Sequence, residues 1–161
     1  MLTTAGPASA APLDLTCTPP SSNLIRYSPP LSNRPQSTTI DTTTQYGPCT
    51  SLTQPGVTSG TRSSHLTGTL SCLELLAPTR ITFTITWNTG RTSTVQANVQ
   101  SSLAGATLTV VTTGTVTSGL FAGDSVVQTN VGAATDTAVC TLGLGTVSSI
   151  YSTVTLEITS V

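Results

Sequence analysis

The sequence reads Ile81-Thr82-Phe83-Thr84-Ile85-Thr86-Trp87, then Asn88-Thr89-Gly90-Arg91-Thr92, then Ser93-Thr94-Val95-Gln96-Ala97-Asn98-Val99. Apolar and polar residues alternate on both sides of the Asn-x-Gly segment. Two alternating runs that flank a short turn containing Asn and Gly predict an antiparallel β-hairpin. Threonine alternates with apolar residues in the same way through most of the chain. The sequence therefore predicts an all-β protein.

Shorter segments with the same pattern lie on both sides of this hairpin. Together with the hairpin strands, 80–88 and 92–101, the predicted strands are a first strand formed by 13–18 and 23–28, followed by 37–46, 62–73, 106–118, 125–130, 135–142 and 147–160. Pro19-Pro20 interrupts the first strand, and proline within a strand indicates an edge or a bulge. The segment from Glu74 to Pro78 is too short for a helix and ends in proline, so we expect a turn that places Leu75 or Leu76 in the core.

The number and spacing of these strands predict the architecture. Eight or nine short strands, with Gly/Pro turns and no amphipathic helix, are typical of two antiparallel sheets packed face to face. We therefore predict an immunoglobulin-like β-sandwich; a closed β-barrel is the alternative, because period-two alternation is common to both. The predicted core consists of Ile81, Phe83, Ile85, Trp87, Val95, Ala97, Val99, Leu108, Val110, Val116, Val154, Leu156 and Ile158.

Length and charge limit the class of protein. At 161 residues the chain has the size of one domain, and we expect that domain to span residues 11–161. The chain contains five Arg, six acidic residues and no Lys, with a net charge of −1. It therefore offers no basic face for phosphates or anionic lipid, so we expect neither nucleic acid nor membrane insertion.

The first residues resemble the end of an export signal. Ala8 and Ala10 fit the A-x-A pattern that precedes signal-peptidase cleavage. We therefore interpret residues 1–10 as the remnant of a signal peptide or a disordered leader, and we expect a secreted, extracellular protein.

The four cysteines, Cys17, Cys49, Cys72 and Cys140, form an even set with no C-x-x-C spacing, and we expect two disulfides rather than a metal site. Four cysteines allow three connectivities. Cys17 and Cys49 lie sixteen residues on either side of Asn33, in the loop between two strands expected to pair. This placement favours Cys17–Cys49 together with Cys72–Cys140. Two disulfides in turn indicate an oxidising compartment.

Residues able to support catalysis are few. His65 is the single histidine, and its neighbours Ser63 and Ser64 lie on the same short segment, so a catalytic triad is the least favoured reading. The candidate carboxylates for an acid–base pair are Asp14, Asp41, Glu74, Asp124, Asp136 and Glu157, and nothing in their spacing marks a pair. We predict no catalytic, metal-binding or cofactor-binding residue.

Aromatic residues suggest one binding hypothesis. Trp87 occupies the inward register of its strand, so we expect it in the core. Tyr27 and Tyr46 are expected to lie freer, on the edge formed by the first strands, where they could stack against a sugar ring.

Several motifs carry a resemblance to a known family. They are Leu15-Thr16-Cys17, Tyr46-Gly47-Pro48-Cys49, Gly68-Thr69-Leu70-Ser71-Cys72, Ile85-Thr86-Trp87-Asn88-Thr89-Gly90 and Gly114-Thr115-Val116-Thr117-Ser118-Gly119-Leu120-Phe121-Ala122-Gly123-Asp124. Together they resemble small secreted proteins of filamentous actinobacteria that include the adaptor subunit of umbrella toxin particles.

The resemblance implies a non-enzymatic adaptor between a lectin subunit and a large repeat toxin, used in competition between bacteria. We expect a docking surface within residues 11–35, and the candidate partner-binding residues are Tyr27, Pro29, Pro30 and Tyr46. The alternative function is a free-standing module that binds carbohydrate or a cell surface.

Overall fold

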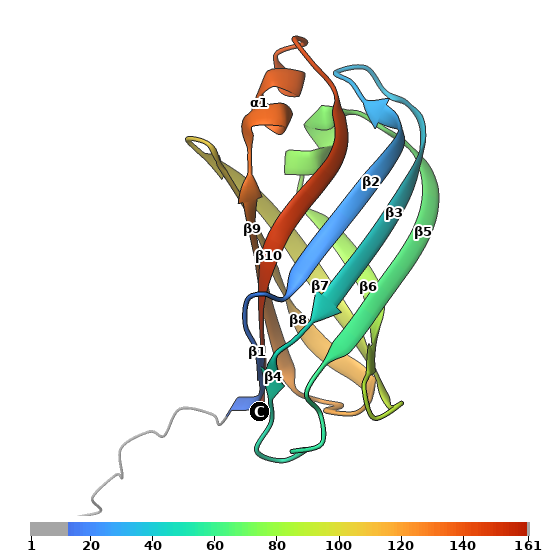
Figure 1. Cartoon of the computed structure of the whole chain (residues 1–161). Coiled ribbons are helices and arrows are strands. Elements are labelled where there is room, and N and C mark those ends of the chain that lie inside the picture. Colours follow the sequence, from blue (N-terminus) through green and yellow to red (C-terminus); the bar gives the residue numbers. More distant parts are fainter. Residues whose placement is uncertain (1–12, 161) are drawn as a thin grey trace, which may run out of the picture.

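A computed structural model describes residues 13–160 and shows a closed antiparallel β-barrel of eight strands (Figure 1). The predicted leader, residues 1–10, lies outside the described residues. In spatial order the barrel strands are β2 (Ser22–Leu31), β3 (Gln36–Tyr46), β5 (Gly60–Leu70), β6 (Thr79–Trp87), β7 (Thr92–Ala104), β8 (Thr107–Gly119), β9 (Ser125–Ala133) and β10 (Val147–Thr159). The barrel closes because β10 pairs with β2 as well as with β9.

The predicted β-sandwich is therefore wrong, and the barrel named as the alternative is correct. Each strand has one inward and one outward face in either architecture, so the alternation along one strand is the same. What distinguishes them is whether the first and last strands of the sheet pair. That contact joins residues as far apart as Ser22 and Thr153, which the local pattern does not report.

The central hairpin is confirmed. Strands β6 and β7 pair from Thr79↔Val99 to Thr86↔Thr92. Gly90, with φ of 87°, occupies the left-handed region that the turn requires and donates its N–H to the Trp87 carbonyl at 2.9 Å.

Two short strands extend the sheet at the lower end of the barrel in Figure 1. These are β1 (Leu13–Cys17) and β4 (Cys49–Thr50). Strand β1 pairs with the last part of β10, while β2 pairs with the first part, so the two strands follow one another along β10. Cys17 lies directly opposite Cys49 in the β1–β4 pair, and the predicted Cys17–Cys49 disulfide is confirmed.

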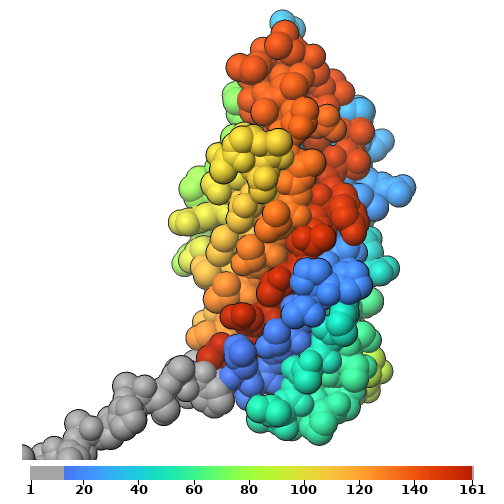
Figure 2. Space-filling model, turned by 60° about the vertical axis from the view of Figure 1, so that its left-hand side comes forward, coloured from blue at the N-terminus to red at the C-terminus, as the bar shows by residue number. Residues whose placement is uncertain are grey.

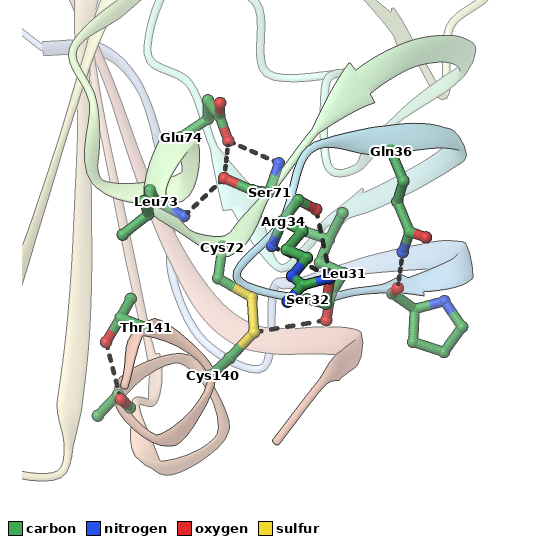
Figure 3. Close-up of a disulfide and its surroundings, with 12 residues drawn as sticks. Leu31, Ser32, Arg34, Gln36, Ser71, Cys72, Leu73, Glu74, Cys140 and Thr141 are labelled. Carbon is green, nitrogen blue, oxygen red and sulfur yellow. Dashed lines mark hydrogen bonds between the residues drawn. A yellow bond between two sulfur atoms is a disulfide. The ribbon is translucent and has the colours of Figure 1, made fainter. Parts of the chain in front are cut away.

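The upper end of the barrel is covered by two short helices, the 3-10 helix η1 (Cys72–Leu76) and α1 (Thr135–Thr141). The Cys72–Cys140 disulfide joins them, which confirms the second predicted pairing (Figure 3). In the space-filling view, α1 and the residues after it form the upper tip of the molecule, above β9 and β10 (Figure 2).

The strand predicted at 135–142 is wrong, because this segment is α1. Ala134, Thr137 and Cys140 are buried, and their spacing of three residues is that of one helical face rather than of a strand. Asp136 lies in the first turn, where a carboxylate favours a helix N-terminus.

Large side chains fill the lower half of the barrel. The core cluster there includes Tyr46, Phe83, Ile85, Trp87, Val95, Val116, Val126, Val154, Leu156 and Ile158. Strand β5 approaches this cluster through Gly60, where a Cβ atom would lie 2.7 Å from Trp87 Cε3. Glycine is thus required for the indole to pack against the backbone of β5.

The predicted core residues all point into the barrel, but they are not equally buried. Most of them are buried, whereas Ile81, Val99 and Val110 are only half-buried. Val99 and Val110 lie in the upper half, which is less completely filled. The incompletely filled upper half of the barrel is therefore where the candidate site lies.

The close approach of β8 to β7 gives a test of the barrel packing. A Cβ atom on Gly114 would lie 2.0 Å from the Gln96 carbonyl oxygen, whereas a Cβ atom on Gly68, in β5, would meet no atom within 4 Å. We expect Gly114→Ala to destabilise the protein by about 2 kcal/mol or more, because the backbone of β7 must move. Gly68→Ala should be neutral or stabilising by about 0.5 kcal/mol.

Urea denaturation of the two variants beside the wild type measures the difference as a shift of the midpoint at constant slope. Equal midpoints for both variants would contradict the packing described for β7 and β8.

Candidate functional site

A cavity of about 570 Å3 occupies the upper half of the barrel interior. Its walls are mainly aliphatic, and the residues that line it are Asn23, Ile25, Tyr27, Ile40, Leu70, Glu74, Leu75, Ala77, Pro78, Thr79, Val99, Ser101, Leu108, Val110, Asn130 and Ile150. The volume is within the range of pockets that hold small molecules, roughly 300 to 1,000 Å3. Two further hollows lie over β6, β7 and β8, and both are lined largely by Thr, Asn, Gln and Arg80.

A ring of polar side chains separates the cavity from the filled lower half; we call it the polar belt. Its members are Asn23, Thr44, Arg62, Thr112, Gln128, Asn130 and Ser152. Strand register explains part of the ring, because Arg62 pairs with Thr44, Thr44 with Asn23, and Asn23 with Ser152 on four neighbouring strands. Asn23 and Asn130 line the cavity directly, so they form its floor.

Hydrogen bonds within the polar belt use the amide oxygens of the floor. Thr44 Oγ1 donates to Asn23 Oδ1 at 2.7 Å, and Gln128 Nε2 donates to Asn130 Oδ1 at 3.0 Å. Below them, the Tyr46 hydroxyl donates to Gln128 Oε1 at 2.7 Å. Each floor asparagine accepts through its oxygen, so its Nδ2 group remains to donate to a bound molecule.

Arg62 places a positive charge at the same level. Its guanidinium carbon lies 4.1 Å from the centroid of the Phe83 ring, and its Nε is buried without a hydrogen-bond partner. Within residues 13–160 the one ion pair is His65–Asp41, so the described chain gives Arg62 no carboxylate. Burial lowers the pKa of Arg62, and the neighbouring Tyr46 hydroxyl offsets part of this effect.

The wall of the barrel is only partly hydrogen-bonded between β5 and β6. These strands pair only at Gly60↔Trp87 and Thr61↔Thr86, so Arg62 stands where they separate. Above it, Leu66 shares the inward register of Ile40 but is 61% exposed, and the inward side of Gly68 meets no atom within 4 Å. The wall of the barrel is therefore incomplete on this side.

The η1 helix lies over the cavity, which it lines through Glu74 and Leu75. Leu75 contributes to the lining, as expected for the segment before Pro78. Ser71 and Glu74 form a capping box in which the Ser71 N–H donates to Glu74 Oε2 at 2.6 Å. These bonds lower the pKa of Glu74, an exposed residue of η1 itself.

The predicted partner-binding residues divide into two groups. Pro29 and Pro30 are exposed, close to the end of β2. Tyr27 and Tyr46 are only 6% and 2% exposed, so the expectation that they lie free on an edge is wrong. Both tyrosines point into the barrel. Strands β2 and β3 are each paired on both sides, so neither of them is an edge strand.

The remaining candidates lie apart from the cavity or at its rim. His65 and Asp41 form an ion pair across β3 and β5, with side chains 72% and 52% exposed, which marks a solvated surface pair. Asp14 and Asp124 are brought together, and desolvation followed by the hydrogen bond and charge of Asp14 raises the pKa of Asp124 to about 6. Neither carboxylate lines the cavity.

Residues 13–160 lack two kinds of feature. No group of three or more His, Cys, Asp or Glu side chains is arranged to hold a metal ion. No helix among the described residues has the length and apolar character needed to cross a membrane.

The floor of the cavity was missed by sequence reasoning. Asn23 and Asn130 of the floor, like Arg62 of the polar belt, are polar residues in alternating strands, where polar positions are expected to face solvent. The available signal was register: Arg62 and Gly60 share one face of β5, and Asn130 shares one face of β9 with Val126.

Comparison with known proteins found no match to a family model, a curated protein or a solved structure.

Burial of the two inward tyrosines predicts a loss of stability at alkaline pH. Burial raises the pKa of Tyr27 and of Tyr46 from 10.0 to about 12. The native state therefore holds these protons more tightly than the unfolded state, so their contribution is complete below pH 10 and is lost between about pH 10 and 12. We expect each tyrosine to account for about 2 to 3 kcal/mol of this decrease.

Urea denaturation across this pH range measures the decrease, and Tyr27→Phe should make it smaller. A decrease of the same size in Tyr27→Phe would show that this phenol ionises equally in the folded and unfolded chains.

Proposed function

We propose that this protein is an extracellular binding protein that holds one small, largely apolar molecule inside its β-barrel. The observation that supports the proposal is the cavity of about 570 Å3 with aliphatic walls and a polar floor. Pockets of this kind, with apolar walls and a few polar groups that orient the ligand, are typical of small-molecule sites.

The dimensions of the barrel favour this function. An eight-stranded barrel has an interior that side chains can just fill, or that can hold one small ligand. In the lower half, large residues such as Trp87 and Tyr46 fill the space. In the upper half, inward positions carry small residues such as Gly68 and Ser101, which leave the space open. A ligand in this space would gain about 0.8 kcal/mol for each buried methylene group.

The extracellular location rests on the cysteines. All four are paired, as Cys17–Cys49 and Cys72–Cys140, which indicates an oxidising compartment. We propose export from the cell in addition to this oxidising compartment.

The earlier functional hypotheses stay predictions. The adaptor function rests on the resemblance alone, and of its four candidate residues Pro29 and Pro30 are available at the surface. A glycan platform on Tyr27 or Tyr46 requires exposed rings, and both rings are buried. The geometry therefore favours a ligand inside the barrel over one on its edge.

Binding of a neutral fluorescent probe, N-phenyl-1-naphthylamine, tests the proposal. The probe should bind the wild type with enhanced, blue-shifted emission and a stoichiometry of one. Val110→Trp should abolish this signal, because Val110 points into the cavity and an indole would occupy the space. Val111→Trp is the matched control: the next residue of β8 points outward, so the substitution should leave probe binding unchanged.

The stability of both variants, measured by urea denaturation, establishes that each is folded. Absence of probe binding to the wild type, or equal binding to a folded Val110→Trp variant, would refute a ligand site in the barrel.

A further inference from the structure

We infer that the ligand is an uncharged carbonyl compound, such as a ketone or an ester. Its carbonyl oxygen accepts hydrogen bonds from the side-chain amides of Asn23 and Asn130 at the floor of the cavity. This inference rests on the proposed function, and it adds the chemical class of the ligand and the end of the cavity at which its polar group lies.

The first support is that each floor asparagine has an unused donor that a ligand can reach. The side chains of Asn23 and Asn130 are only 5% and 8% exposed, and both line the cavity. Their oxygens accept hydrogen bonds within the polar belt, but no group of residues 13–160 accepts one from either Nδ2. Arg62 Nε is the one fully buried side-chain nitrogen or oxygen without a partner in the described chain, so both Nδ2 atoms keep accessible surface. In buried residues that line the cavity, this surface faces the cavity.

The second support is that the direction of the hydrogen bonds beneath the floor is fixed. A guanidinium can only donate, so the Tyr46 hydroxyl accepts from Arg62 and donates its own hydrogen to Gln128 Oε1. The other end of the Gln128 amide, Nε2, then donates to Asn130 Oδ1. Reversing the Asn130 amide would place two donors against each other. The floor therefore presents a donor to the cavity, and the ligand must bring the acceptor.

The third support is the position of the two asparagines on either side of β10. Asn23 of β2 pairs with Ser152, and Asn130 of β9 pairs with Val154, the next inward residue of β10. The two amides thus approach the floor from neighbouring strands on opposite sides of β10. A carbonyl oxygen has two lone pairs, so one such oxygen can accept a hydrogen bond from each amide.

The fourth support is the absence of a positive charge from the cavity wall. None of the residues that line the cavity is Arg, Lys or His. A carboxylate in the cavity would lose its water without gaining an opposite charge, whereas an uncharged carbonyl group loses much less. Above the floor the lining is aliphatic, including Ile25, Leu108 and Val110, and would contact the hydrocarbon part of the ligand.

Competition among three ligands of similar shape tests the polar group. Cyclohexyl methyl ketone, isopropenylcyclohexane and cyclohexanecarboxylate share one ring and differ in carrying C=O, C=CH2 or a carboxylate. Each is titrated at neutral pH against wild-type protein saturated with N-phenyl-1-naphthylamine. We expect the carboxylate to need a concentration at least about tenfold higher than the ketone to displace the probe. Equal or better displacement by the carboxylate would refute an uncharged ligand while leaving a ligand site in the barrel intact.

Variants of the floor then test the two donors. Asn130→Leu and Asn23→Leu keep the approximate size of the side chain and remove its amide. In each variant we expect the affinity for the ketone, relative to that for the alkene, to fall about tenfold, because only the ketone loses a hydrogen bond. Asn98→Leu, at an exposed position of β7, is the matched control and should keep the wild-type ratio.

The carbonyl stretch of the bound ketone gives a second measurement that requires no variant. Infrared difference spectra of the wild type with and without the ketone should place this band at a lower frequency than in cyclohexane, because accepting hydrogen bonds weakens the C=O bond. A band at the cyclohexane frequency would show that the carbonyl group is not hydrogen-bonded, which refutes its placement on the floor.

The outcomes separate the two proposals. Failure of the wild type to bind the neutral probe refutes the proposed function itself. Normal probe binding, together with a ketone that does not displace the probe or an unchanged ratio in the folded Asn23→Leu and Asn130→Leu variants, refutes the carbonyl ligand. Asn23 and Asn130 would then serve only the hydrogen bonds of the polar belt. If neither variant folds, the carbonyl stretch in the wild type decides the question.

Discussion

The pairing of β10 with β2 is the contact on which the rest of the structure depends. Strand β10 pairs with β9 along most of its length, with β2 along its first part and with β1 along its last part. It therefore joins the two ends of the sheet. Without this contact the eight strands would form an open sheet, and side chains such as Trp87, Val154 and Leu156 would lose the opposite wall against which they are buried.

Closure creates one interior, but the sequence fills it unevenly. Aromatic and branched side chains occupy the lower half, so most of the hydrophobic stabilisation resides there. The upper half is bounded by the polar belt below and by η1 above, and it remains open. The disulfides match this division, because Cys17–Cys49 joins β1 to β4 at the filled end and Cys72–Cys140 joins the two helices that cover the open end.

Local patterns in the sequence predicted the parts of the fold that depend on local geometry. The hairpin at Gly90, the inward residues of β6 and β7 and both disulfides follow from alternation, turn chemistry and spacing. The barrel closure, the helix at α1 and the cavity could not be predicted in this way, because each depends on which distant segments meet. The floor was hidden for a further reason: Asn23 and Asn130 are residues that alternation normally assigns to solvent.

Burying the side chains of the polar belt costs free energy, which indicates that the belt has a role other than stabilising the fold. Replacing a buried charge by an apolar side chain of similar volume is often neutral or stabilising, so Arg62 is not needed to close the barrel. The same holds for Asn23 and Asn130, whose amides are buried in a protein with ample threonine and valine for inward positions. A barrel selected only for stability would continue its lower core upward. A barrel that must admit and hold a largely apolar molecule requires a dry wall and a few polar groups that orient the molecule, and the aliphatic wall of this cavity and the two asparagines of its floor provide both.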